Sequence, residues 1–86
     1  MRRAAEITDQ ELHGFASWFT TTFRTDRERK WMSFALAPRF TRREWFTTSL
    51  EGAMHCPARD AKVLVRRMTK LKLVKRHKDF VELLNT

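Results

Sequence analysis

Apolar residues recur at helical spacing between residues 57 and 71. The positions that share this spacing are Ala61, Leu64, Val65, Met68 and Leu71. Intervals of three and four residues place them on one face of an α-helix. The opposite face carries Arg59, Arg66 and Lys70, flanked by Lys62 and Val63. The pattern predicts an amphipathic helix over residues 57–71 whose buried face points away from a row of positive charges.

The chain then changes to a pattern that is typical of β-strands. Residues 73–76 and 80–83 are short runs with apolar and β-branched side chains, and the polar tripeptide 77–79 separates them. Residues 73–84 are therefore predicted to form a two-stranded hairpin with a charged turn.

A first helix is predicted over residues 8–23. Thr8 and Glu11 have the spacing of a capping box, and Ile7 and Leu12 have that of a hydrophobic staple around it. The expected buried stripe comprises Leu12, Phe15, Ala16, Phe19 and Phe23. Trp18 lies about 100° or more from that stripe. Three consecutive threonines at 20–22 predict the helix end near residue 23, and residues 1–6 are expected to be frayed.

Residues 24–39 give a less regular pattern. Thr25 and Glu28 form a second capping-box pair, and the apolar residues after them run up to Pro38, which would end a helix. A short helix over residues 26–36 is predicted. A strand over residues 31–36 is the alternative, since the apolar residues there follow neither period.

A further helix is predicted over residues 42–51. Thr41 and Glu44 have capping-box spacing, and Phe40 can pack on Trp45. The expected buried face holds Trp45, Phe46, Ser49 and Leu50. Gly52 is expected just past the helix end with a positive φ, followed by Met54 as an apolar plug between the helices and Pro57 in the first turn of the next helix. This order is a helix-turn-helix in outline.

Residues 40–84 resemble the winged helix-turn-helix superfamily in having a short helix, a turn, the amphipathic helix and then the hairpin, or wing. The resemblance includes Met68-Thr-Lys-Leu-Lys-Leu-Val-Lys-Arg76, in which Lys72 stands where this superfamily usually has glycine. Lysine adopts the left-handed conformation of that position at a cost of about 1 kcal/mol. The resemblance implies a mainly α fold with a small β-hairpin wing, formed by residues 1–86 as a single domain, with double-stranded DNA as its ligand.

The chain is strongly basic, and its charge is unevenly placed. Its 18 Lys and Arg residues against 10 Asp and Glu residues give a formal net charge of +8. Residues 1–23 hold two cations and three anions, whereas residues 56–86 hold nine cations and three anions. The positive charge thus coincides with the third helix and the wing, as expected for a protein that binds nucleic acid.

Ten basic residues are predicted to contact DNA. They are Arg59, Lys62, Arg66 and Lys70 on the helix, Lys75, Arg76, His77 and Lys78 on the wing, and Arg42 and Arg43. Arg59 and Arg66 are the candidates for contacts with guanine, and the wing is expected to contact the backbone or the minor groove. Arg42 and Arg43 lie at a helix N-terminus, which favours phosphate. The alternatives are pairing of these two with acids such as Glu51 or Asp26, and ordinary solvated charge on the helix and wing.

The sequence contains no pattern typical of catalysis or metal binding. His55 and Cys56 are adjacent, so their side chains diverge, and these two with His13 and His77 lack the spacing of metal ligands. No glycine-rich phosphate loop is present. We expect no enzyme activity, no cofactor and no metal; metal or redox sensing by His55, Cys56 and His77 is a minor alternative. The aromatic residues follow helical stripes, which favours a core over a base-stacking surface.

The expected location is the cytoplasm, or the nucleus in a eukaryote. The single cysteine cannot form an internal disulfide, no apolar run is long enough to cross a membrane, and no secretory signal begins the chain.

We expect a small transcriptional regulator or repressor that binds duplex DNA sequence-specifically. A chain of this length buries a modest core, so a homodimer is expected, with Trp18 at the contact. The alternative for Trp18 is that residues 24–39 fold over it in a monomer. The alternatives for function are a winged-helix protein-interaction adaptor and a non-specific RNA-binding or nucleoid-type protein.

Overall fold

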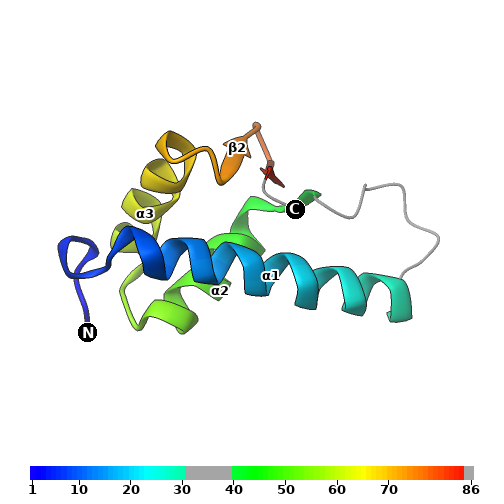
Figure 1. Ribbon diagram of the computed structural model, residues 1–86, viewed down its shortest axis with the longest axis horizontal. Coiled ribbons are helices and arrows are strands. Elements are labelled where there is room, and N and C mark those ends of the chain that lie inside the picture. Colours follow the sequence, from blue (N-terminus) through cyan, green and yellow to red (C-terminus); the bar gives the residue numbers. More distant parts are fainter. Residues whose placement is uncertain (31–39, 85–86) are drawn as a thin grey trace.

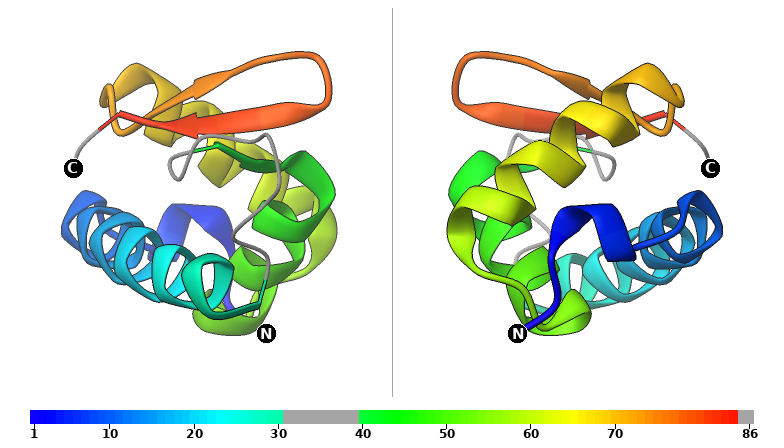
Figure 2. Two further views of the ribbon diagram at one scale, coloured as in Figure 1. Left: turned by 90° about the vertical axis from the view of Figure 1, so that its right-hand side faces the viewer. Right: turned by 90° about the vertical axis from the view of Figure 1, so that its left-hand side faces the viewer.

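The computed structural model describes residues 1–30 and 40–84, which form helices and a small three-stranded antiparallel sheet (Figure 1). The elements are the 3-10 helix η1 (Ala4–Glu6), the α-helices α1 (Asp9–Lys30), α2 (Arg43–Met54) and α3 (Ala58–Lys70), and the strands β1 (Phe40–Arg42), β2 (Val74–Arg76) and β3 (Phe80–Leu83). The fold is mainly helical, as the sequence predicts. Figure 2 shows the β2–β3 hairpin beside α3 on one side of the molecule and α1 on the opposite side.

The core forms where α1, α2 and α3 meet. Phe46 of α2 is fully buried, and its ring lies 5.5 Å from that of Phe15 and 5.1 Å from that of Phe19, both on α1. Both pairs are edge-to-face, a geometry that adds about 0.5–1.5 kcal/mol per pair to the area buried. This aromatic cluster joins α1 to α2. The buried face predicted for α3 is confirmed for its four positions within the helix, Ala61, Leu64, Val65 and Met68.

The N-terminal cap of α1 is confirmed. The Glu11 carboxylate accepts a hydrogen bond from the Thr8 backbone N–H at 2.9 Å, and Thr8 Oγ1 accepts one from the Glu11 N–H at 3.2 Å. Ile7 and Leu12 are buried on either side of this box. Two hydrogen bonds lower the pKa of Glu11 below its usual value. The larger effect comes from the Thr8 backbone N–H and the next from the Arg2 side chain.

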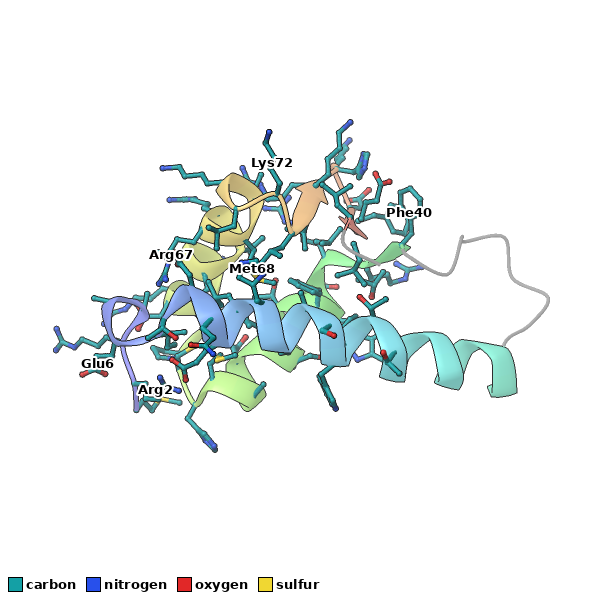
Figure 3. The ribbon with its side chains drawn as sticks, in the orientation of Figure 1. Arg2, Glu6, Phe40, Arg67, Met68 and Lys72 are labelled. Carbon is teal, nitrogen blue, oxygen red and sulfur yellow. The ribbon has the colours of Figure 1, made fainter. Side chains whose placement is uncertain are left out.

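The expectation that residues 1–6 are frayed is wrong. The Arg2 N–H donates to the His55 carbonyl at 2.8 Å, and its guanidinium lies 2.8 Å from the Glu11 carboxylate. Arg67 of α3 donates to the Ala4 carbonyl at 2.9 Å and to Asp9 Oδ1 at 2.6 Å. Figure 3 shows Arg67 between α3 and the N-terminal segment. These partners lie far along the chain, where a local pattern cannot indicate them.

Helix α1 does not end at residue 23 but continues to Lys30. Within the threonine run, Thr20 donates to the Ala16 carbonyl and Thr21 to the Ser17 carbonyl, so their hydroxyl groups are satisfied inside the helix. The propensity cost of about 0.5 kcal/mol per threonine is too small to end it. The first part of the helix predicted over residues 26–36 belongs to α1, which contradicts a helix start there. Its remainder lies outside the described residues.

The capping box predicted for the second helix is also wrong, although the helix begins within one residue of its predicted start. Residues 40–42 form β1, in which Thr41 pairs with Val81 of β3, and Arg42 occupies the N-cap position without a side-chain cap. Thr41 is fully buried, and its hydroxyl has no hydrogen-bond partner in the part of the chain that the structure describes. Trp45, predicted to be buried with Phe46, is 50% exposed.

The turn between α2 and α3 uses a different residue from the one predicted. Helix α2 continues through Gly52 to Met54, and His55 adopts the left-handed conformation with φ 53°. The Cys56 N–H donates to the Glu51 carbonyl at 3.2 Å, which closes the helix end. Met54 is buried as expected. Cys56 is buried as well, and burial raises the pKa of its thiol.

The end of α3 and the hairpin are confirmed. Lys72 has φ 62°, the left-handed conformation expected at the position where the winged helix-turn-helix superfamily usually has glycine. The Leu73 N–H donates to the Met68 carbonyl at 2.9 Å and the Lys72 N–H to the Thr69 carbonyl at 3.1 Å, the two bonds of a Schellman motif. Strands β2 and β3 follow and pair antiparallel, with β3 in the middle of the sheet order β1-β3-β2.

Replacing Thr41 by valine is expected to raise the free energy of unfolding by about 1 kcal/mol, because an unpaired buried hydroxyl costs about 1–3 kcal/mol and a methyl group of the same shape does not. Urea denaturation measures the change. Thr41→Ser, which keeps the hydroxyl and loses the methyl group, should be less stable than the wild type. A loss of about 1 kcal/mol in Thr41→Val would instead show that Thr41 caps α2.

Candidate nucleic-acid interface

The exposed face of α3 is a row of cations. Arg59, Lys62, Arg66 and Lys70 are all exposed, and none of them forms an ion pair or hydrogen bond with another described residue. The single acid on the helix, Asp60, lies away from this row. Val63, 40% exposed, lies among the cations. We call this surface, Arg59, Lys62, Val63, Arg66 and Lys70, the α3 face.

The two flanks of α3 are engaged differently. On one flank, Arg67 binds Ala4 and Asp9, so it anchors the helix to the N-terminal segment and is not part of the α3 face. On the other flank, Lys62 faces a pocket shared with α2 and the hairpin. The helix is therefore anchored on the Arg67 flank, and its other flank opens onto the pocket.

The hairpin presents three of its four predicted residues to solvent. Lys75, Arg76 and Lys78 are exposed, and Lys75 lies opposite Glu82 in the strand register. His77 is half-buried: its Nε2 lies 3.0 Å from Glu82 Oε1, and its ring centroid is 5.6 Å from that of Phe40. His77 thus contributes to holding the sheet together as well as to the wing.

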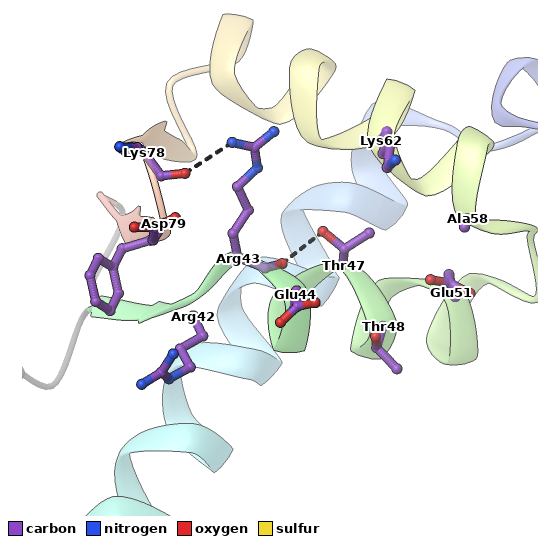
Figure 4. Close-up of a pocket in the computed structure, with 11 residues that line it drawn as sticks. Arg42, Arg43, Glu44, Thr47, Thr48, Glu51, Ala58, Lys62, Lys78 and Asp79 are labelled. Atoms are coloured by element: carbon purple, nitrogen blue, oxygen red, sulfur yellow. Dashed lines mark hydrogen bonds between the residues drawn. The ribbon is translucent and has the colours of Figure 1, made fainter.

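A pocket of about 580 Å³ brings together basic residues from β1, α2, α3 and the turn of the hairpin. Its charged lining residues are Arg42, Arg43, Glu44, Glu51, Lys62, Lys78 and Asp79. Figure 4 shows Arg43 reaching from the start of α2 toward the wing turn, while Arg42 points the other way. Because three acids accompany the four cations, the net positive charge of the surface lies mainly on the α3 face and the wing.

Arg43 fastens the wing to α2. Its Nη1 donates to the Lys78 carbonyl at 3.2 Å, and its backbone N–H donates to the Asp79 carbonyl at 3.0 Å. The sequence predicts that Arg43 contacts a phosphate of DNA. The structure gives it a second role, which depends on a carbonyl 35 residues away and has no local signal.

Arg42 and Arg43 do not take the paired alternative with Glu51, since neither forms an ion pair with it. The other acid considered, the Asp26 side chain, lies outside the described residues. Arg42 remains exposed at the N-cap of α2, where the helix dipole favours an anion.

Trp18 of α1 is 54% exposed, although its ring lies 5.8 Å from that of Phe15 and 6.3 Å from that of Phe19. It belongs to the helix on the opposite side of the molecule from the hairpin (Figure 2). Trp18 is therefore not part of the basic surface.

In the residues that the structure describes, no three His, Cys, Asp or Glu side chains gather closely enough to hold a metal ion. No helix in the same residues combines the length and the apolar character that crossing a membrane requires.

Comparison with known proteins gave no match to any family model, curated protein or solved structure. What this chain binds must therefore be inferred from its charge and geometry.

Arg43→Ala is expected to loosen the wing turn, because it removes the hydrogen bond to the Lys78 carbonyl. The His77 N–H, which donates to the Phe80 carbonyl across the turn, should exchange with solvent about fivefold faster, corresponding to the loss of about 1 kcal/mol. NMR-detected hydrogen exchange measures this rate.

Arg42→Ala is the matched control, since Arg42 is the neighbouring arginine and its side chain forms no hydrogen bond with the described residues. It should leave the exchange of His77 unchanged. Equal exchange rates in the two variants would contradict the role given to Arg43.

Proposed function

We propose that this chain is a winged helix-turn-helix protein that binds double-stranded DNA. Support comes from the order of its elements: α2, a turn, α3 and a two-stranded antiparallel hairpin. The observation that carries the proposal is the α3 face, whose four cations have no partner among the described residues. A helix face that only meets solvent usually mixes both signs of charge.

The dimensions of α3 suit the major groove. An α-helix is about 10–12 Å across with its side chains, and the groove is about 12 Å wide. Arg59 and Arg66 are seven residues apart, about 10.5 Å along the helix at 1.5 Å per residue. Base pairs are spaced about 3.4 Å apart, so the two arginines reach guanines roughly three base pairs apart.

Val63 adds an apolar contact between the two arginines. It is 40% exposed and lies within the α3 face. In the major groove, the apolar group that a base presents is the methyl group of thymine. We assign Val63 to such a contact, which sequence reasoning did not include among the site residues because an exposed valine alone gives no signal.

The wing supplies contacts that do not depend on sequence. Lys75, Arg76 and Lys78 are exposed on the hairpin, and Arg43 holds its turn against α2. These cations are proposed to contact phosphates and so to set the orientation of α3 in the groove. Arg42, at the start of α2, is proposed to contact a further phosphate.

The alternatives receive less support from the same surface. An RNA duplex has a deep and narrow major groove that side chains cannot read, so the α3 face suits DNA better. An adaptor would bind a protein, and the core of a protein interface is depleted in charge, unlike the α3 face. Sequence-specific duplex binding would in turn support a role as a transcriptional regulator or repressor.

Arg66→Ala is expected to weaken binding to a duplex selected from a random library by about 1–3 kcal/mol, or roughly 5- to 150-fold, by removing a guanine contact. Fluorescence anisotropy at fixed salt measures the affinity, and denaturation should show an unchanged free energy of unfolding. Arg3→Ala removes an exposed cation outside the α3 face and should have a much smaller effect. Failure of the wild type to bind duplex DNA at physiological salt would favour the adaptor.

Lys78→Ala is expected to lower the affinity for all duplex sequences about equally. The slope of log K against log salt should decrease in magnitude by about 0.9, the value for one phosphate contact. The variant keeps the Lys78 carbonyl that accepts the Arg43 hydrogen bond, so the turn should stay in place. A loss confined to one base position would contradict a phosphate role.

A further inference from the structure

An apolar groove of about 480 Å³ lies between α1 and α2. Its lining residues are Phe15, Trp18, Ser49, Gly52, Ala53 and Met54. The lining carries no charged side chain, in a protein whose net charge is +8. Exposed apolar surface is unfavourable in water, so this groove is a candidate contact site.

Neither the backbone conformation nor the packing around Gly52 requires a glycine at this position. It lies in the interior of α2, where glycine is less favourable than alanine, and it does not adopt a positive φ. A Cβ atom built on it would meet nothing within 4 Å. A glycine at this place leaves bare backbone on the groove, which allows a bulky side chain to approach closely.

The same surface supplies a side chain of the right kind. Trp18 borders the groove and is 54% exposed, beside the small residues Ser49, Gly52 and Ala53. A half-exposed aromatic side chain at the edge of a hollow suits two-fold pairing, in which the side chain of each copy enters the hollow of the other.

Charge does not oppose a second copy at the groove as much as it would elsewhere on the surface. Two chains of +8 repel each other, least where neither presents cations. The groove is uncharged, and α1 lies on the opposite side of the molecule from the basic hairpin (Figure 2). Pairing through the groove would leave the α3 face and the wing of each copy exposed.

From these observations we propose that the groove binds Trp18 of a second copy of this chain, forming a two-fold symmetric dimer. The proposal does not depend on DNA binding. If the chain does bind DNA, the dimer presents two α3 faces and reads two half-sites. The contact is small compared with a standard interface of about 1,200–2,000 Å², so we expect a dissociation constant of about 10–100 µM.

Sedimentation equilibrium of the full chain between about 1 and 300 µM, without DNA, tests the dimer. The wild type should pass from monomer to dimer over this range. Trp18→Ala should weaken the association at least tenfold, as expected for a central tryptophan. Gly52→Leu should do the same by filling the hollow, and it leaves the exposed ring in place.

Circular dichroism checks that each variant is folded, and Gly52→Leu keeps the test valid if Trp18→Ala does not fold. Leu84→Ala, which removes exposed apolar surface at the end of β3, is the control and should dimerise as the wild type does. A monomeric wild type at 300 µM overturns the proposal. The groove would then be covered by residues of the same chain or by another protein. Wild-type affinity in both folded groove variants overturns it as well.

Discussion

The orientation of α3 about its own axis is the constraint on which the basic surface depends. Its apolar positions must face the core, which turns Arg59, Arg66 and Lys70 outward. Arg67 then anchors one flank to the N-terminal segment. A rotation of the helix by one residue, about 100°, would bury cations without partners, at a cost of several kcal/mol for each. The proposed DNA contact thus uses the face of α3 that remains exposed after its apolar face is buried in the core.

Strand β1 joins the hairpin to α2. It pairs with β3, the central strand of the sheet, and is followed directly by α2, so the hairpin lies beside the start of α2. Arg43 completes the junction by binding the turn of the hairpin. The wing is therefore attached at both ends: β2 follows directly from the capped end of α3, and the turn is attached to α2. A wing held in this way can position α3 in a groove without losing much conformational entropy on binding.

The two sides of the molecule differ in charge and apolar character. Cations are concentrated on α3 and the hairpin, whereas the groove between α1 and α2 is apolar and uncharged. This division separates a surface suited to phosphate from one suited to a protein, and the aromatic cluster around Phe46 joins the two helices that line the groove. Contacts on the two sides would therefore be compatible in one assembly.

α3, the hairpin and the cap of α1 follow from the sequence, because helical periodicity, turn residues and capping boxes depend on neighbours within a few positions. The sequence also indicated the cations of the α3 face, since the buried stripe implies its opposite. That Thr41 lies in a strand and not at a helix cap depends on long-range pairing, because its partner, Val81, is 40 residues away. The same holds for Arg43 and Arg67, whose partners are 35 and 63 residues distant in the chain. The local sequence around a charged side chain does not show whether that side chain contacts solvent, a phosphate or a remote carbonyl.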